Sequence, residues 1–254
     1  MHFSRFCLAN LTTETLRPRL AKPSPLVVLV PVGSVEPHGP HLPLRTDTII
    51  GESAAYRAAE KLETKGVDVL VGPSIPYGVT RFAEGFAGAV SVTESALAAF
   101  LRAVVMGYVE AGFAHVCLIN NHLEPAHDAA VRKSIEDVPP GLASVASPLT
   151  RRHARTLSAE FKSGACHAGR YETSLVLAAD PHVVDMDRAA GLAKLDWSLS
   201  TGIREGKTNF LAIGMTEAYT GAPAEASAEE GRDLTDKLAD MIVIEVEEGL
   251  GARQ

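Results

Sequence analysis

Short apolar runs alternate along this chain with longer segments in which apolar residues recur at helical spacing. The short runs predict buried strands at residues 26–32, 67–71, 114–119 and 142–145. The longer segments predict helices at residues 48–65, 95–111, 125–137, 150–162, 172–179 and 227–248. Strands that alternate with helices in this way favour an α/β fold, here a single domain over residues 1–254. We expect a three-layer α/β/α arrangement with a mainly parallel central sheet.

Residues at the ends of these segments support the predicted helices. Thr93 is a suitable N-cap, because its hydroxyl can accept a hydrogen bond from a free backbone N–H of the first turn. Gly66 and Gly112 follow predicted helices at the position where glycine commonly ends one. Pro125 is tolerated in a first helical turn and disfavoured further in, so it predicts a helix start.

Composition narrows the classes of protein that need to be considered. The chain has 254 residues, 46% of them hydrophobic and 22% charged, and a net charge of −7. An acidic chain without clustered Lys and Arg argues against nucleic-acid binding. We expect no membrane association, because no apolar run approaches the ~18–20 residues that a bilayer requires and the N-terminus resembles no signal peptide. Three scattered cysteines are too few for a disulfide framework, so we expect a cytoplasmic protein.

The first candidate site follows the first predicted strand. Glu36, His38, His41 and Asp47 lie within a dozen residues, and ligands collect at the carboxyl ends of parallel strands. Glu36 and His38 are alternate residues, so in an extended stretch they point the same way, and Asp47 can return after a turn. Carboxylates with an imidazole suit Zn²⁺, Mn²⁺ or Fe²⁺ better than Ca²⁺ or Mg²⁺. The alternative is a polar loop whose acids cap the next helix.

A second cluster follows the third predicted strand. His122 and Glu124 come directly after Asn120 and Asn121, and again a histidine and a glutamate are two residues apart. Two such pairs at the ends of two core strands can converge on one site. Alternatively, these residues begin a helix, with Glu124 favoured in its first turn by the helix dipole.

A third cluster contains His167 and Glu172, just before and within a predicted helix. A histidine near a metal site can hold or deliver the proton that a departing amine requires. Glu172 either orients His167 or belongs to the start of the helix. The alternative for His167 is a structural loop histidine.

Taken together, these stretches resemble the creatininase family of metal-dependent amidohydrolases. Pro31 to Asp47 resembles the family pattern Pro-x-Gly-Ser-x-Glu-x-His-Gly-Pro-His-Leu-Pro-x-x-x-Asp. Asn120 to His122 resembles its Asn-Gly-His segment, and His167 to Ser174 its His-Ala-Gly-x-x-Glu-Thr-Ser segment. Weaker similarities at residues 86–91 and 221–231 extend the match over about residues 26–231.

The resemblance implies a site with two divalent transition metals per chain, Zn, Mn or Fe. Glu36 and His122 would hold one ion, His38 and Glu124 the other, and Asp47 would bridge both. His167 corresponds to the catalytic histidine of the family. Glu124 is a second catalytic candidate, as a base, if ligation leaves it free.

Departures from the family pattern bear on the substrate. Leu123 stands where the creatinine-hydrolysing enzyme has a tyrosine that contacts substrate, and Ser163 and Gly164 stand where it has a Trp-Asp pair. Creatinine is therefore a poor candidate. Pro37 replaces a common glutamine and leaves the Glu-x-His spacing unchanged. Asn121 replaces a glycine, and asparagine tolerates the left-handed region.

These observations predict a hydrolase that cleaves a C–N bond other than a peptide bond, in a cyclic amide or a formamide-like small molecule. We expect a hydroxide held between the metals to attack the carbonyl, and His167 to protonate the amine. One alternative is a peptidase acting on the C-terminus of a modified peptide. Another is a non-catalytic protein that binds a small ligand on the same fold.

The remaining expectations concern partners and two arginines. The family resemblance implies a homo-oligomer, in particular a hexamer. Arg81 and Arg170 lie near the motifs and are expected at the surface or an interface. The alternative is that they bind a substrate carboxylate or phosphate.

Overall fold

A sheet of four parallel strands forms the centre of the protein. The computed structural model describes residues 5–252. The strands are β1 (Leu26–Val32), β2 (Asp68–Val71), β3 (His115–Asn120) and β4 (Ala143–Ala146). Their order across the sheet is β2-β1-β3-β4, and β1 and β3 form its centre. All four predicted strands are present, with ends that differ by one residue at most.

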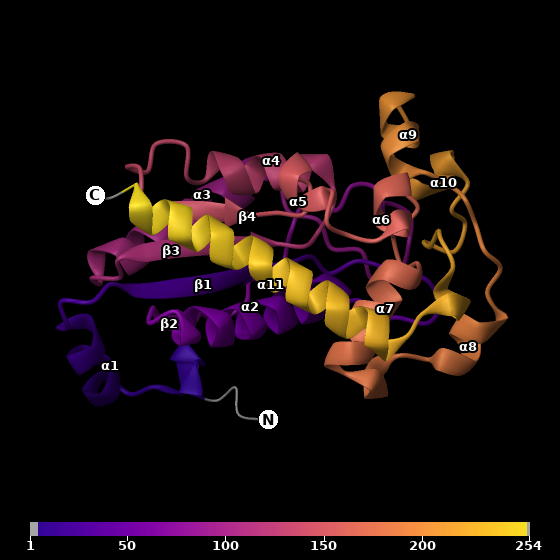
Figure 1. The fold of residues 1–254 in the computed structure, drawn as a ribbon. Helices are drawn as coiled ribbons and strands as arrows, with labels where there is room; N and C mark the ends of the chain where they lie inside the picture. The colour runs from indigo at the N-terminus through magenta and orange to yellow at the C-terminus, as the bar shows by residue number, and fades with distance from the viewer. Residues whose placement is uncertain (1–4, 253–254) are drawn as a thin grey trace.

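Helices cover both faces of this sheet (Figure 1). They are α1 (Thr13–Leu20), α2 (Thr46–Thr64), α3 (Glu94–Glu110), α4 (Pro125–Lys133), α5 (Arg151–Ala154), α6 (Ala159–Ser163), α7 (Arg170–Ala179), α8 (Met186–Gly191), α9 (Leu199–Arg204), α10 (Phe210–Ile213) and α11 (Ala228–Gly251). No helix among the described residues is long and apolar enough to span a membrane.

The side chains of β1 explain why the molecule has three layers. Val27 and Leu29 belong to the core cluster that contains residues of α2, α7 and α11. Val28 and Val30, which point to the opposite face, belong to the cluster packed beneath α3 and α4. A central parallel strand must be apolar on both faces, as this one is. The predicted α/β/α arrangement is confirmed.

The predicted helix at residues 150–162 is wrong in one respect, because the structure divides it into α5 and α6. Ser158 has an extended backbone, and its side chain accepts a hydrogen bond from the N–H of Phe161. Serine competes for backbone hydrogen bonds in this way and favours a cap over a helix interior. The buried Leu157 lies between the two helices. The helix predicted from Pro125 ends at Lys133, four residues early.

The strand order places a switch point between β1 and β3. The chain moves from β1 to β2 on one side, and then returns to the other side of β1 to form β3. The segments that leave β1 and β3 therefore diverge at the carboxyl edge of the sheet. In open α/β sheets this divergence creates a crevice, and ligands bind there.

Gly231 allows α11 to pack closely on α7. A Cβ atom at this position would overlap the backbone oxygen of Ser174 and approach Ala178 Cβ to 2.8 Å. This contact holds the long C-terminal helix against the segment that carries His167 and Glu172.

Replacing Gly231 with alanine is predicted to lower the free energy of unfolding by about 3 kcal/mol, because neither the backbone nor α11 can move away cheaply. Gly107→Ala is the matched control. Gly107 lies in α3 with nothing within 4 Å of its Cβ position, so alanine there is expected to be neutral or slightly stabilising. Urea unfolding followed by circular dichroism measures both variants. Equal stability of the two would contradict the packing assigned to Gly231.

Candidate metal centre

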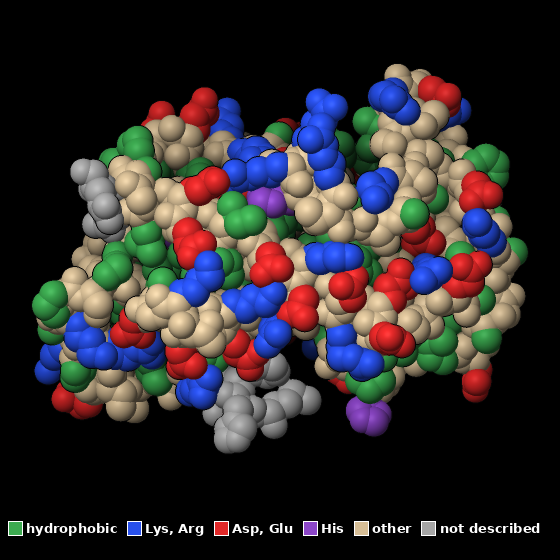
Figure 2. All heavy atoms as spheres, in the orientation of Figure 1, with side chains coloured by type: hydrophobic (Ala, Val, Ile, Leu, Met, Phe, Trp, Pro, Cys, Tyr) green, Lys and Arg blue, Asp and Glu red, His purple; other side chains and the backbone are tan. Residues whose placement is uncertain are grey.

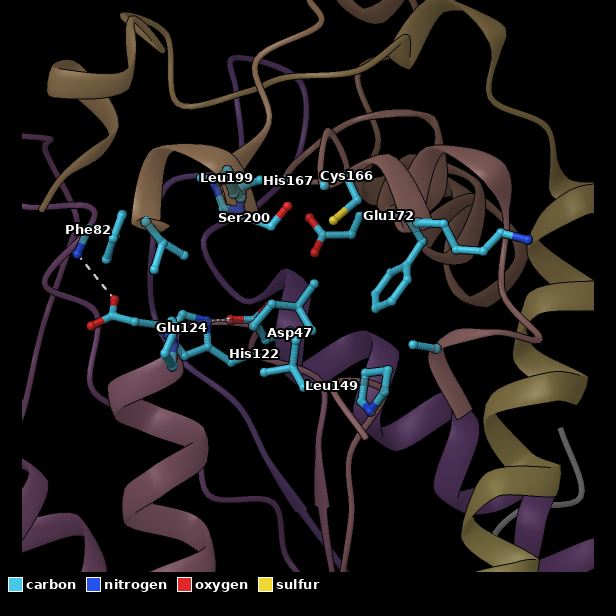
Figure 3. A pocket seen from close by; sticks show the side chains of 18 of the residues that line it. Asp47, Phe82, His122, Glu124, Leu149, Cys166, His167, Glu172, Leu199 and Ser200 are labelled. Atoms are coloured by element: carbon cyan, nitrogen blue, oxygen red, sulfur yellow. Dashed lines mark hydrogen bonds and ion pairs between the residues drawn. The ribbon is translucent and has the colours of Figure 1, made fainter. Parts of the chain in front are cut away.

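Six ionisable side chains converge at the carboxyl edge of β1 and β3. They come from the loop after β1, the first turn of α2, the loop after β3 and the start of α7. Each is at most 5% exposed: Glu36, His38, Asp47, His122, His167 and Glu172. Figure 3 shows Asp47 and His122 facing the same space as His167 and Glu172.

Two donor groups share the carboxylate of Asp47. In the first, His122 Nδ1 lies 3.2 Å from Glu36 Oε1 and 3.2 Å from Asp47 Oδ2. In the second, His38 Nε2 lies 3.3 Å from Asp47 Oδ1 and 3.5 Å from Glu172 Oε2. The donor atoms within each group are close enough to hold one metal ion. Asp47 turns one oxygen to each group.

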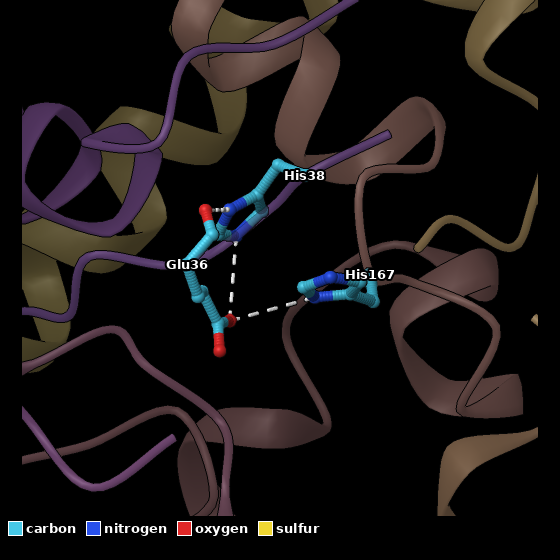
Figure 4. A group of neighbouring side chains, drawn as sticks. All are labelled: Glu36, His38 and His167. Atoms are coloured by element: carbon cyan, nitrogen blue, oxygen red, sulfur yellow. Dashed lines mark hydrogen bonds and ion pairs between the residues drawn. The ribbon is translucent and has the colours of Figure 1, made fainter. Parts of the chain in front are cut away.

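His167 belongs to a third group, with Glu36 and His38 (Figure 4). Its Nδ1 lies 3.8 Å from Glu36 Oε1, and its ring centroid lies 4.5 Å from that of His38. The next residue, Ala168, has a φ of 48° and is fully buried. Its N–H donates to Glu172 Oε2 over 2.7 Å, which ties the loop to the first turn of α7. A non-glycine residue in this region carries strain, which the surrounding structure holds in place.

Backbone carbonyls orient the three histidines. His122 Nε2 donates to Val79 O at 2.8 Å, His38 Nδ1 to Glu36 O at 3.1 Å, and His167 Nε2 to Pro37 O at 3.0 Å. Each bond requires the proton on the outer nitrogen, so the inward nitrogen of the neutral ring carries a lone pair. This is the arrangement that metal-binding histidines adopt.

The buried polar atoms of the centre fit a divalent cation. His38 Nε2 and both oxygens of Asp47 make no hydrogen bond within residues 5–252. Buried polar atoms are costly without a partner, and buried carboxylates more so. Three carboxylates and three imidazoles form a nitrogen and oxygen donor set that suits Zn²⁺ or Mn²⁺ better than Ca²⁺.

The pKa values show the same demand for positive charge. Burial lowers the pKa of His38, but the charges of Asp47 and Glu172 outweigh it and raise that pKa to about 10. Burial raises the pKa of Glu36, yet the nearby His122 brings it down to about 2. Burial, with repulsion from Asp47, raises the pKa of Glu172 to about 8. The same group of carboxylates would therefore favour a bound cation.

Glu124 lies at the edge of this centre and belongs to none of the three groups. Its Oε1 accepts from the N–H of Arg81 at 3.2 Å. Its Oε2 accepts from the N–H of Phe82 at 3.1 Å, as Figure 3 shows. Burial raises the pKa of this carboxyl. The distances favour Glu172, rather than Glu124, as the acid beside His38.

Two supporting residues had no recognisable signal in the sequence. Thr80 donates its hydroxyl proton to Glu36 Oε2. His127 Nδ1 accepts from the N–H of Val79 at 3.2 Å, and its ring lies 4.7 Å from that of His122. Since Val79 O accepts from His122, the backbone of one residue connects the two histidines. Residues 78–80 match no sequence motif, so only the folded structure shows that this segment supports Glu36 and His122.

The other polar residues near the motifs have partners of their own. His41 Nε2 lies 2.8 Å from Thr173 Oγ1 and takes no part in the donor groups. Arg81 pairs with Glu94 at 3.2 Å. Arg170 Nε pairs with Glu230 at 2.6 Å, at the contact between α7 and α11.

A cavity of about 570 Å³ opens above the donor groups. Its floor includes Glu36, Asp47, His122 and Glu172, with Glu124 on one wall. Apolar side chains from several elements form much of the remaining wall: Leu123, Leu149, Phe161, Leu199, Ile203 and Phe210. The cavity gives a small molecule or a chain end access to the buried centre.

A parallel α/β sheet with a carboxylate shared by two donor groups at its switch point is the arrangement expected of a metal-dependent hydrolase. The family model described as creatinine amidohydrolase matches residues 9–246. The chain belongs to the creatininase family.

Relatives within the family have different activities by name. The chain is 32% identical over 228 residues to the mycofactocin precursor peptide peptidase of Mycobacterium ulcerans (strain Agy99), which covers 84% of this chain and 81% of that protein. It is 25% identical to the creatinine amidohydrolase of Pseudomonas putida, over 71% and 74% of the two chains. A solved structure named "Creatininase Mn" superposes with a TM-score of 0.72 at 20% identity, covering 96% of this chain and 98% of that one. This last similarity confirms the fold.

Asp128 supports the loop that carries His122. The N–H of His122 donates to Asn120 Oδ1 at 2.9 Å, and Asn120 Nδ2 donates to Asp128 Oδ1 at 3.1 Å. Ser147 and Arg132 also donate to this carboxylate, each at 2.7 Å. Burial raises the pKa of Asp128, but the hydrogen bonds from Arg132 and Ser147 outweigh it and hold that pKa below its usual value near 3.8.

Asp128→Asn is predicted to lower the free energy of unfolding at neutral pH by about 1–3 kcal/mol, since hydrogen bonds to a charged group are lost. A lowered pKa stabilises the fold above the usual carboxyl pKa, and this contribution disappears as the pH falls through the lowered value. The difference between wild type and variant should therefore shrink on acidification. Urea titrations at several pH values measure it, with the exposed Asp137→Asn as control. A difference that persists unchanged in acid would contradict the charge-based account.

Proposed function

We propose that the chain hydrolyses an amide C–N bond and holds two divalent transition metals for this purpose. Glu36, Asp47 and His122 would hold one ion, and His38, Asp47 and Glu172 the other. The observation that carries the proposal is the position of Asp47, whose Oδ2 lies 3.2 Å from His122 Nδ1 and whose Oδ1 lies 3.3 Å from His38 Nε2. A carboxylate turned to two donor groups is suited to bridge two cations.

Two bound cations would lower the pKa of a water and polarise the substrate carbonyl. The residues of the chain provide the proton transfers. Burial lowers the pKa of His167 and so favours its neutral ring, whose Nδ1 can take up a proton. It can then pass that proton to the departing nitrogen. Glu124, held by two backbone N–H groups, is a second proton carrier at the cavity wall.

Two kinds of substrate are compatible with this centre. A cyclic amide or a formamide-like molecule is the first, and creatinine is disfavoured because Leu123, Ser163 and Gly164 replace the side chains that would hold it. A peptide is the second, and it is supported by the 32% identity to the mycobacterial precursor peptide peptidase. A non-catalytic binding protein would have no need for two complete donor groups and His167.

Asp47→Asn is predicted to abolish both bound metal and turnover, because each donor group loses its shared oxygen. Mass-spectrometric metal analysis of the purified wild type should find about one to two transition ions per chain. Turnover is assayed on cyclic amides, formamides and short peptides. Asp196→Asn, whose side chain is 84% exposed, is the control and should change neither. Full activity in a metal-free wild type would refute the proposal.

Glu172→Gln and Glu124→Gln are predicted to separate ligation from proton transfer. Glu172→Gln should lower the affinity for one of the two metals by at least about tenfold, since it removes an acid from the His38 group. Glu124→Gln should retain both metals and lower kcat. Metal titration and steady-state kinetics on the same preparations measure the two effects. Loss of a metal in Glu124→Gln, with both retained in Glu172→Gln, would instead assign Glu124 as the ligand.

Assembly into a homo-oligomer, in particular a hexamer, stays a prediction from the family resemblance. Sedimentation equilibrium of the purified chain would test it.

A further inference from the structure

The outer part of the cavity is basic, although its floor is acidic and the chain as a whole carries a charge of −7. Four exposed basic side chains line it, which we call the basic rim: Arg151, Arg155, Lys162 and Arg204. They come from α5 and the residue after it, from α6 and from the end of α9. Figure 2 shows Lys and Arg side chains gathered over these helices.

The basic rim has no acid partner in the structure of residues 5–252. Arg204 donates only to neutral groups, Ser200 O at 3.2 Å and Thr201 Oγ1 at 3.0 Å. Arg152, on the same short helix as Arg151, is different. It turns to α11 and pairs with Glu245 at 2.6 Å and Glu248 at 2.7 Å. Helix α5 therefore carries Arg152, which is ion-paired with α11, and Arg151, which lines the cavity without an acidic partner among the described residues.

The acidic side chains that line the cavity do not neutralise the positive charge of the basic rim. Glu36, Asp47 and Glu172 are buried in the donor groups, and Glu124 is held by the backbone N–H groups of Arg81 and Phe82. Positive charge gathered at the mouth of a cleft attracts anions and raises their local concentration. Guanidinium groups in particular bind carboxylates through paired hydrogen bonds.

An apolar zone contributes to the wall of the same cavity. Leu149, which is 40% exposed, Leu199 and Ile203 line it together with the buried Phe161 and Phe210. These side chains would contact an apolar segment of a bound molecule.

We propose that the substrate is an amide with an apolar body and a carboxylate, and that the carboxylate binds at the basic rim while the amide reaches the metal centre. This inference rests on the proposed hydrolysis, since it assumes that an amide occupies the centre. The C-terminus of a peptide and an acidic side chain are two sources of such a carboxylate.

Three probes separate these sources. They are N-acetyl-phenylalanyl-leucine, its C-terminal carboxamide, and N-acetyl-phenylalanyl-glutamic acid with an amidated C-terminus. Dissociation constants are measured by calorimetry with the zinc-loaded chain of 254 residues, and hydrolysis is assayed separately. At least one free acid should bind about tenfold more tightly than the neutral carboxamide, because several exposed charges each contribute a modest attraction. Added salt should weaken this preference.

Variants test whether the rim itself is responsible. Arg151→Gln/Arg155→Gln should remove most of the preference for the acid. Arg152→Gln/Lys207→Gln is the matched control, because it removes two charges from residues that do not line the cavity, and the preference should persist.

Equal binding of acid and carboxamide, or measurable binding of none of the probes, would overturn the proposal. A preference that survives Arg151→Gln/Arg155→Gln, and also survives when Lys162→Gln and Arg204→Gln are added, would overturn it as well, since the rim would then not hold the carboxylate. Binding and turnover are measured apart, so their failures can be distinguished. A protein that prefers the acid through its rim and hydrolyses no amide would contradict the proposed function and leave the carboxylate site intact.

Discussion

The buried carboxylate of Asp47 sets the constraint on which the functional edge of this molecule depends. It is 1% exposed, makes no hydrogen bond with the described residues, and faces an imidazole on each side. Such a group is costly unless positive charge lies beside it. Backbone carbonyls hold the outer nitrogens of His38 and His122, so the inner nitrogens are free to bind a cation that would supply this charge beside Asp47. The negative charges of Asp47 and Glu172 also raise the pKa of His38 above its usual value, against the effect of burial.

The fold can meet this constraint because of where β1 and β3 end. Their divergence at the switch point lets the loop after each strand contribute one histidine to the same space, and α2 and α7 add acids from their first turns. Asp47 and Glu172 thus lie in helices, and backbone hydrogen bonds hold the histidines that the loops contribute. Acidic, apolar and basic side chains all line the cavity above the donors.

Much of this architecture could be predicted from the sequence. The apolar runs located all four strands, since a central parallel strand is buried on both faces and shows little polar alternation. The N-cap at Thr93 was correct, because capping is a local interaction between the side chain and the N–H of Ala96. The helix predicted at 150–162 failed for a related reason. Apolar spacing continued through the segment, while the side chain of Ser158 interrupted it. Helices α8 to α10 lacked sustained periodicity and were not predicted.

The sequence by itself determined which residue types stand near the ends of the core strands, and therefore the chemistry available there. Glu36, His38, Asp47 and His122 were recognisable because their spacing follows directly from the strands that precede them. Only the tertiary structure decided which acid lies beside His38. Glu124 is two residues from His122 in the chain, yet its carboxylate is held by Arg81 and Phe82, whereas Glu172 reaches His38 from α7. Spacing along the chain sets local direction, but packing between distant helices sets which side chains meet.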